Sequence, residues 1–366
     1  MFGRRAFYRG EKRSTWVFTL LLSIPVALLV AFFWMFYDLQ KDLVYEKDGL
    51  HLDFGAEETA EEGEEESTGT VARREIQLLS DVEIVVDKTD YSHVVTTAGT
   101  GLRGYHGRFI PADNLTPTLL DSFVAGSGDY NALVLEVKPS SGMLAYSSAI
   151  PLAASYGVNG SLDLAAYVER LKAKGLYMVA QVSGLVDVAM SVRYSQIALK
   201  NASSGEVYMS GEGYGWLDPY SDQTRTYISG ILEELKGMGF DEVLLSGIWC
   251  PGGEMLQFST RMTETPDTQS AVSSFVLYLR RYAEKLDLKL SGIAEPAALR
   301  SGSTGALGQD LEVFFKAFDR VAFVDDGVSY AAFLTVLEEL AGSDGGKRIL
   351  PICTGYAPEH ESYIIK

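Results

Sequence analysis

The sequence predicts an α/β protein whose main domain, residues 101–366, is a (β/α)8 TIM barrel. Eight short apolar runs suited to buried parallel strands recur along this region. Segments with apolar residues at helical spacing separate them, and the span is close to the ~250 residues of a typical barrel. The predicted strands are Tyr105–Ile110, Ala132–Lys138, Tyr177–Ser183, Glu242–Gly247, Lys289–Ala294, Val321–Val324, Arg348–Cys353 and Ser362–Ile365.

Four segments between these strands carry apolar residues on one helical face. Glycines that follow two of them supply stop signals. The helical markers are Leu164, Val168 and Leu171; Tyr227, Ile231 and Leu235; Val272, Val276, Leu279 and Leu286; and Phe333, Val336 and Leu340.

The N-terminal region predicts a single membrane-spanning helix. Residues 1–13 are basic, and residues 14–37 contain no charged side chain. A helix of that length spans about 36 Å, enough to cross a ~30 Å hydrocarbon core. A cleaved signal peptide would have a shorter apolar core and a small-residue cleavage site. The basic flank predicts a cytoplasmic tail at 1–13 and an extracellular C-terminal domain on the cell membrane.

Residues 38–74 predict a disordered acidic linker, because Glu57–Glu66 holds seven glutamates in ten residues. Dense like charge keeps a chain extended, so a solvated spacer is favoured over a tail that binds calcium or a cationic partner. Residues 75–100 predict a short β extension beside the barrel.

Composition excludes several functions. The net charge of −18 argues against nucleic acid as a partner. The four histidines lack metal-site spacing, which argues against a zinc hydrolase. Neither a metal nor a cofactor is expected. The glycine motif at 99–104 precedes a strand rather than a helix, which argues against dinucleotide binding. Cys250 and Cys353 end non-neighbouring strands and are expected to be separate thiols.

Barrels hold their chemistry where the strands end, and the sequence places several carboxylates and aromatic rings there. Paired carboxylates with rings that stack on sugars are typical of glycoside hydrolysis. Glu295 is the candidate proton donor, and Glu136 or Asp325 the candidate nucleophile or base. The candidate substrate-binding residues are Trp216, Trp249, Tyr146, Asp187 and Asp326.

Three stretches have the order and spacing of a known family. They are Asn131–Gly142 (NALVLEVKPSSG), Leu164–Ala180 (LAAYVERLKAKGLYMVA) and the pair Gly215–Tyr220 and Gly239–Val243 (GWLDPY, GFDEV). From about Leu102 onward the chain resembles the bacterial putative glycoside hydrolase domain family. The resemblance implies a TIM barrel and hydrolysis of a polysaccharide.

The sequence departs from this family at the rim. The family typically ends its fourth strand with Phe-Asp-Tyr-Ile-Arg-Phe-Pro, whereas this chain has Leu245–Pro251 (LSGIWCP). Ser246 therefore replaces the aspartate, and Trp249 replaces the arginine. Glu136 stands where the family tends to carry Asp, and Gln181 where it often has Arg.

Two functions remain open. The first is a membrane-anchored glycoside hydrolase that acts on a cell-wall or extracellular polysaccharide. The second is a catalytically inactive barrel that binds a glycan or an envelope protein partner, which the loss of the strand-four aspartate at Ser246 favours.

Overall fold

A computed structural model of the protein describes residues 43–46, 49–52, 94–126, 128–252, 256–259, 267–301, 303–304, 307–325 and 329–366. The chain divides into two units, residues 1–84 and 85–366. The first unit is described only in β1 (Leu43–Glu46) and β2 (Gly49–Leu52), which pair antiparallel. The second unit contains the barrel.

Within the predicted linker the structure describes the hairpin of β1 and β2, and the other residues of 38–74 lie outside the described residues. Glu46 pairs with Gly49 at the closed end of the hairpin, and Leu43 pairs with Leu52 at its open end. The predicted membrane helix at 14–37 lies outside the described residues, which themselves contain no helix long and apolar enough to cross a bilayer. Of the predicted β extension, residues 94–100 are described; they contain no strand and end in a turn at 98–100.

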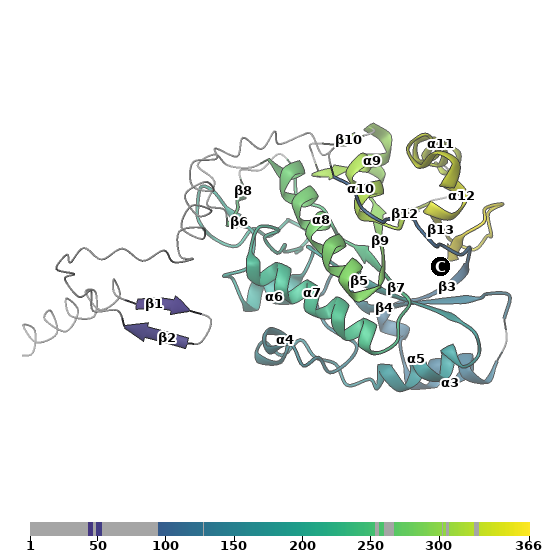
Figure 1. The fold of residues 1–366 in the computed structure, drawn as a ribbon, viewed down its shortest axis with the longest axis horizontal. Coiled ribbons are helices and arrows are strands. Elements are labelled where there is room, and N and C mark those ends of the chain that lie inside the picture. Colours follow the sequence, from purple (N-terminus) through teal and green to yellow (C-terminus); the bar gives the residue numbers. More distant parts are fainter. Residues whose placement is uncertain are drawn as a thin grey trace, which may run out of the picture. The chain divides into compact units, whose positions relative to one another are not determined.

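Eight parallel strands close into a barrel (Figure 1), in the order β12, β13, β14, β3, β4, β5, β7, β9. All eight predicted strands are confirmed, with ends that differ by at most one residue. Their bounds are β3 His106–Ile110, β4 Ala132–Lys138, β5 Tyr177–Ser183, β7 Glu242–Ser246, β9 Lys289–Ala294, β12 Arg320–Val324, β13 Ile349–Cys353 and β14 Tyr363–Ile365.

Helices connect most neighbouring strands, and the four predicted helices are confirmed as α5, α7, α8 and α11. Side-chain caps begin three of them, for example Ser221 at α7 and Asp267 at α8. The helices are α3 Pro117–Ala125, α4 Pro151–Ser155, α5 Leu164–Lys172, α6 Val188–Arg193, α7 Asp222–Gly237, α8 Thr268–Leu286, α9 Pro296–Ser301, α10 Leu311–Ala317, α11 Tyr330–Ala341 and α12 Gly345–Arg348, with 3-10 turns η1 Ala112–Asn114 and η2 Gly342–Asp344.

Two features depart from a regular barrel. Residues 354–362 join β13 to β14 without a helix. Short antiparallel pairs stand beside the barrel: β6 (Lys200–Asn201) with β8 (Leu256–Gln257), and β10 (Ser303–Thr304) with β11 (Gln309–Asp310). β6 belongs to the long segment between β5 and α7, and β8 belongs to the segment between β7 and α8.

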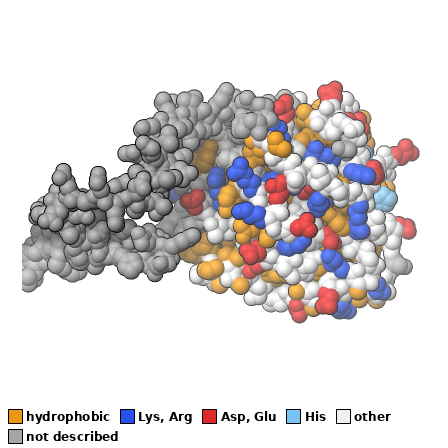
Figure 2. Space-filling view, viewed as in Figure 1, with side chains coloured by type: hydrophobic (Ala, Val, Ile, Leu, Met, Phe, Trp, Pro, Cys, Tyr) orange, Lys and Arg blue, Asp and Glu red, His pale blue; other side chains and the backbone are white. Residues whose placement is uncertain are grey.

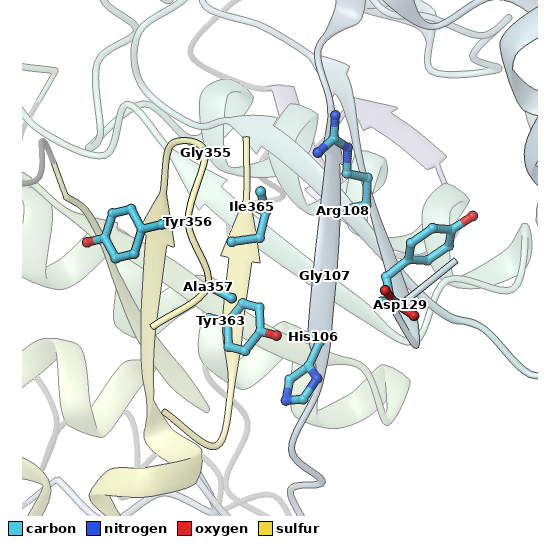
Figure 3. A pocket seen from close by; sticks show the side chains of 10 residues that line it. His106, Gly107, Arg108, Asp129, Gly355, Tyr356, Ala357, Tyr363 and Ile365 are labelled. Atoms are coloured by element: carbon cyan, nitrogen blue, oxygen red, sulfur yellow. The ribbon is translucent and has the colours of Figure 1, made fainter. Parts of the chain in front are cut away.

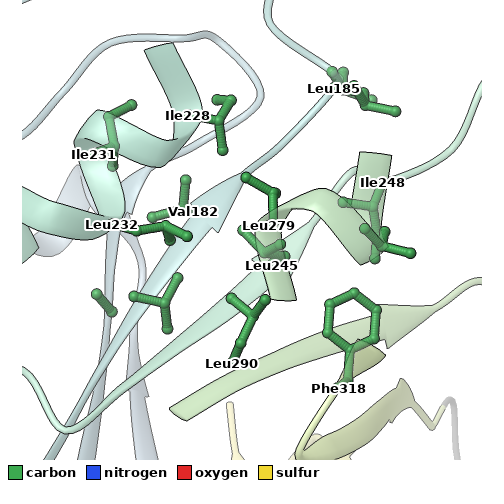
Figure 4. Packing of buried hydrophobic residues seen from close by; sticks show 14 of the residues in the cluster. Val182, Leu185, Ile228, Ile231, Leu232, Leu245, Ile248, Leu279, Leu290 and Phe318 are labelled. Carbon is green, nitrogen blue, oxygen red and sulfur yellow. The ribbon is translucent and has the colours of Figure 1, made fainter. Parts of the chain in front are cut away.

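The hydrophobic core has two layers. Small and branched side chains fill the barrel interior, and a larger cluster lies between the strands and the surrounding helices. Figure 4 shows part of the outer layer, where Ile231 and Leu232 of α7 and Leu279 of α8 lie against Val182 and Leu245 of the strands. The described surface in Figure 2 intersperses acidic and basic side chains, so this face gathers no single-sign patch.

A buried ion pair closes the floor of the barrel, where the strands begin. Glu242 and Arg320 are both fully buried and paired with each other. Ser291 and Tyr177 donate hydroxyl hydrogen bonds to Glu242 at 2.6 and 3.0 Å. The guanidinium of Arg320 also lies 4.8 Å from the ring centre of Tyr105. Each charge therefore depends on the other for compensation.

Replacement of Arg320 by Met should lower the free energy of unfolding by about 3–5 kcal/mol, because it leaves the Glu242 carboxylate buried without its cation. Urea denaturation of the full chain measures this. The double variant Glu242→Gln with Arg320→Met should recover part of the loss, since no charge then remains. An equal loss in both variants would contradict this reading of the pair.

Candidate functional site at the barrel mouth

A cavity of about 330 Å³ opens at the rim where β4, β5, β7 and β9 end. Parallel strands of a closed barrel all end at the same rim, and barrels of this kind hold their active sites there. The cavity is lined by Glu136, Ser140, Ser183, Val186, Tyr214, Ser246, Gly247, Trp249 and Glu295. The fold thus brings two of the three candidate catalytic carboxylates into one space.

Glu295 directly follows β9 and is half-buried at the cavity. Gln309 fixes its backbone, because the side-chain oxygen of Gln309 accepts the Glu295 N–H at 2.8 Å. The amide nitrogen of Gln309 donates to the carbonyl oxygen of Ile248 at 3.2 Å, which ties the end of β9 to the loop after β7. Burial raises the pKa of the Glu295 carboxyl. A carboxylic acid that keeps its proton toward neutral pH is suited to donate it.

Glu136 lies on β4 and points into the same cavity from the other side. The backbone N–H of Ala112 donates to its Oε2 at 3.0 Å, and Nε2 of Gln181 lies 3.5 Å from its Oε1. Donors directed at both oxygens suit an ionised carboxylate. The two glutamates therefore have opposite surroundings: Glu136 is met by donors, and the described residues offer the Glu295 carboxylate none.

The cavity suits a pair of acids that act on one bond. Glycosidases hold their two carboxylates about 5–9.5 Å apart on either side of the bond, and Glu136 and Glu295 both line this one cavity. Hydrolysis of a glycosidic bond by two acids requires that one be neutral and the other ionised.

Two aromatic rings form a wall beside the glutamates. Trp249 and the exposed Tyr214 line the cavity. Trp216 is only 1% exposed and lies behind them, with ring centres 5.0 Å from Trp249 and 6.4 Å from Tyr214. Trp249 thus presents its ring to the cavity, whereas Trp216 supports the wall from inside.

Two other candidate binding residues are buried away from the cavity. Tyr146 donates its hydroxyl to Glu234 of α7 at 2.9 Å. Asp187 is fully buried, 2.7 Å from the Lys138 ammonium, and its Oδ1 accepts the N–H of Met190 at the start of α6. A Cβ at Gly142, where φ is +85°, would collide with this carboxylate. Asp187 and Lys138 therefore hold the loop that carries Ser140 to the cavity.

Asp325 does not line the mouth cavity. It is 1% exposed, it accepts a hydrogen bond from the Tyr356 hydroxyl, and its other oxygen has no partner among the described residues. Val324 precedes it and packs against the barrel interior, so Asp325 faces the other way. Asp326 lies outside the described residues.

Sequence reasoning missed two contributors to the site, Ser183 and Gln309. Ser183 lines the cavity and donates its hydroxyl to the carbonyl oxygen of Val186 at 2.6 Å. Gln309 positions Glu295 from a segment that carried no motif. The alternation of side chains along a strand could have indicated Ser183, since it shares the inward face with Gln181. No motif in the sequence around Gln309 indicated that residue. Cys250 and Cys353 are both buried free thiols, as predicted.

A second cavity, about 410 Å³, lies on the outer wall of the barrel (Figure 3). Residues of β3, such as His106 and Arg108, face those of β14, such as Tyr363, whose ring stacks on His106 with centres 4.3 Å apart. This cavity holds neither glutamate of the mouth. Its position follows from the connection between β13 and β14, which contains no helix to cover the wall.

Comparison with known proteins also indicates a glycosyl hydrolase domain. The family model of a putative glycosyl hydrolase domain matches residues 114–324. No curated protein gives a significant match.

Solved structures resemble the barrel at low identity. The glycoside hydrolase domain of PgaB (BpsB) from Bordetella bronchiseptica is 13% identical, covers 72% of this chain and 94% of its own, and superposes with a TM-score of 0.53. A hypothetical protein from Ruminiclostridium thermocellum ATCC 27405 is 23% identical over 50% of this chain and 95% of its own, with a TM-score of 0.44. The glycoside hydrolase domain of PelA from Pseudomonas aeruginosa is 18% identical over 70% and 86%, with a TM-score of 0.41. The first of these likenesses shows a shared fold.

Glu295→Gln should stabilise the protein at neutral pH and leave it unchanged in acid. The folded-state pKa of Glu295 is raised above its unfolded value, so the folded protein binds more protons and the wild type loses stability as pH rises through that folded pKa. Gln cannot ionise and avoids this loss. Melting temperatures of both proteins between about pH 4 and pH 8 test the trend, with the exposed Glu339→Gln as control. A constant difference across this range would contradict it.

Proposed function

Because the chain belongs to the putative glycosyl hydrolase domain family, we propose that it hydrolyses a glycosidic bond in a cell-wall or extracellular polysaccharide at the mouth of its barrel. The observation that carries this proposal is the pair Glu136 and Glu295 in one cavity, with donors around the first and burial around the second.

Glu295 acts as the proton donor. Its raised pKa keeps a proton available, and it gives that proton to the glycosidic oxygen as the bond to the leaving sugar breaks. The side chain of Gln309 holds the backbone of Glu295, so the position of this proton donor does not depend on bound substrate.

Glu136 is the second carboxylate. It either attacks the anomeric carbon or removes a proton from the attacking water, according to whether the reaction retains or inverts configuration. We assign this role to Glu136 rather than to Asp325, because only Glu136 shares a cavity with Glu295. Trp249 and Tyr214 supply the apolar faces on which the sugar rings stack.

The N-terminal sequence supports an anchored enzyme. A basic stretch at 1–13 followed by the uncharged run at 14–37 favours a single span with the barrel on the outer side of the cell membrane. The acidic segment around Glu57–Glu66 would hold the barrel away from an anionic surface. This topology places the mouth where extracellular polysaccharide is found.

A second function is favoured by one residue. Ser246 lines the cavity at the end of β7, where the family's aspartate is expected, and a serine cannot act as a carboxylate nucleophile. An inactive barrel that binds a glycan or an envelope protein would keep the aromatic wall but would not hydrolyse a glycosidic bond. Binding without release by the wild type, together with release gained by Ser246→Asp, would establish this alternative.

Glu295→Gln and Glu136→Gln should each lower reducing-sugar release at least ~100-fold, because each removes one of the two acids on which bond cleavage depends. The full chain is assayed against peptidoglycan, chitosan, cellulose, xylan and galactan. The exposed Glu339→Gln should keep wild-type rates. Release that survives both cavity substitutions would overturn the assignment.

Trp249→Ala should weaken glycan binding about tenfold and change the maximal rate much less, because it removes a stacking face and no acid. Titration calorimetry with the oligosaccharide that gives most release measures the affinity. Trp249→Phe should restore most of the binding. An unchanged affinity in the alanine variant would show that the ring does not contact the sugar.

A further inference from the structure

We propose that the cavity on the outer wall of the barrel is a second glycan-binding site, which holds a stretch of a neutral polysaccharide chain away from the mouth. The inference rests on the proposed function, because it extends the same class of ligand to a second site. Binding at the outer wall does not require cleavage, so the two claims can fail separately. The outer-wall cavity shares none of its lining residues with the mouth cavity.

The outward-facing side chains of β3 and β14 differ in kind from those of the neighbouring strands. On β4 and β7 the outward positions hold buried aliphatic residues such as Leu133 and Leu245, which pack with the helices in the outer core. On β3 and β14 they hold Arg108, which is exposed, and His106 and Tyr363, which are half-buried. A covering helix is matched by aliphatic side chains, so this wall is suited to a hydrated ligand instead.

Aromatic rings give the outer-wall cavity flat apolar faces. The rings of His106 and Tyr363 stack with an interplanar angle of 15°, and Figure 3 shows them side by side on neighbouring strands. Tyr130, which precedes β4, adds a third ring, and the ring of Phe123 packs edge-on against it with centres 5.6 Å apart. Such rings pack against an apolar surface while their polar edges stay hydrated, which matches the two kinds of surface on a sugar.

Two opposite charges border these rings. Arg108 and Asp129 line the cavity, and the described residues give neither side chain a hydrogen bond or an ion pair. A guanidinium offers only donors and an ionised carboxylate only acceptors, whereas a sugar hydroxyl is both. The charges of Arg108 and Asp129 cancel, so a neutral chain can satisfy both groups. A strongly charged polymer would be repelled by one of them.

The remaining side of the cavity is anchored from within the barrel. Gly355, Tyr356 and Ala357 border it from the segment that joins β13 to β14. The Tyr356 hydroxyl donates a hydrogen bond to Asp325, which is 1% exposed. A buried carboxylate therefore holds this segment in place before a ligand arrives. The volume of about 410 Å³ lies within the range of sites that bind small molecules.

A second site on the same barrel would favour polymers over short oligosaccharides. When the outer wall holds one part of a polysaccharide chain, another part of that chain reaches the mouth at a raised effective concentration. An oligosaccharide too short to extend from the wall to the mouth gains nothing from this effect. The outer wall should therefore act on the KM for a polymer and not on bond cleavage itself.

The first test reports on the wall directly. The chain has four histidines, so the full chain labelled with 13C-histidine gives few ring signals, and that of His106 is assigned by its loss in His106→Gln. Cellohexaose, xylohexaose and N-acetylchitohexaose serve as neutral probes. At least one of them should shift the His106 signal, in the wild type and equally in Trp249→Ala. No shift with any probe, or a shift that is lost in Trp249→Ala, would overturn the proposal.

Matched variants separate ligand contact from effects on the fold, with affinity measured by the same titration. Tyr363→Ala should weaken binding of the responding hexasaccharide about threefold to tenfold, because it removes a stacking face, and Tyr363→Phe should keep wild-type affinity. Arg108→Ala should also weaken binding, whereas the exposed Arg281→Ala should not. Unchanged affinity in both Tyr363→Ala and Arg108→Ala would refute the site.

The second test distinguishes this site from the proposed hydrolysis. On the polysaccharide that gives most sugar release, Tyr363→Ala and Arg108→Ala should raise KM about threefold to tenfold and leave kcat unchanged. Both should release sugar from a trisaccharide at the wild-type rate. A His106 shift in a protein that releases no sugar would refute the hydrolysis alone. Sugar release without any His106 shift would refute the outer-wall site alone.

Discussion

The parallel closure of the barrel is the constraint on which the mouth depends. Strands that all run one way end at a single rim, and their side chains alternate between the interior and the helices. Glu136 on β4 and Glu295 after β9 are far apart in the sequence and are separated by β5 and β7 in the barrel. They meet because closure turns both toward one cavity. Asp325 follows β12 at the same rim, but its side chain faces away from the barrel interior and is buried against Tyr356.

The two ends of the barrel treat a buried carboxylate in opposite ways. At the floor, Glu242 is matched by Arg320 and by the hydroxyls of Ser291 and Tyr177, so its charge is compensated and serves the fold. At the mouth, Glu295 is half-buried, the described residues give it no compensating cation, and burial raises its pKa. Such an arrangement costs stability, and in the proposed reaction it would supply the proton donor, which is the balance expected of a site that performs chemistry. The buried pair of Lys138 and Asp187 is compensated like the pair at the floor, but it lies near the mouth. It holds the loop of Ser140, and neither residue lines the cavity.

The sequence predicted the strands well because buried parallel strands are short apolar runs with turn residues on both sides, and this signal is local. It also proposed Glu136, Glu295 and Trp249 from their positions at strand ends, and these three line the mouth cavity. It could not separate them from Asp325, Tyr146 and Asp187, because lining a cavity depends on parity and on partners from distant segments. Tyr146 donates its hydroxyl to Glu234, and Asp187 forms an ion pair with Lys138. Gln309 was missed for the same reason, since its contact with Glu295 exists only in the folded barrel.

The central claim is that Glu136 and Glu295 flank the bond to be broken. The most direct measurement is a crystal structure of the Glu295→Gln variant with the oligosaccharide that the wild type cleaves best. The account predicts sugar across the mouth cavity, stacked on Trp249, with the glycosidic oxygen within hydrogen-bond distance of the residue at 295 and the anomeric carbon facing Glu136. A sugar bound only on the outer wall beside Tyr363, or in the mouth with neither glutamate near its glycosidic bond, would contradict it.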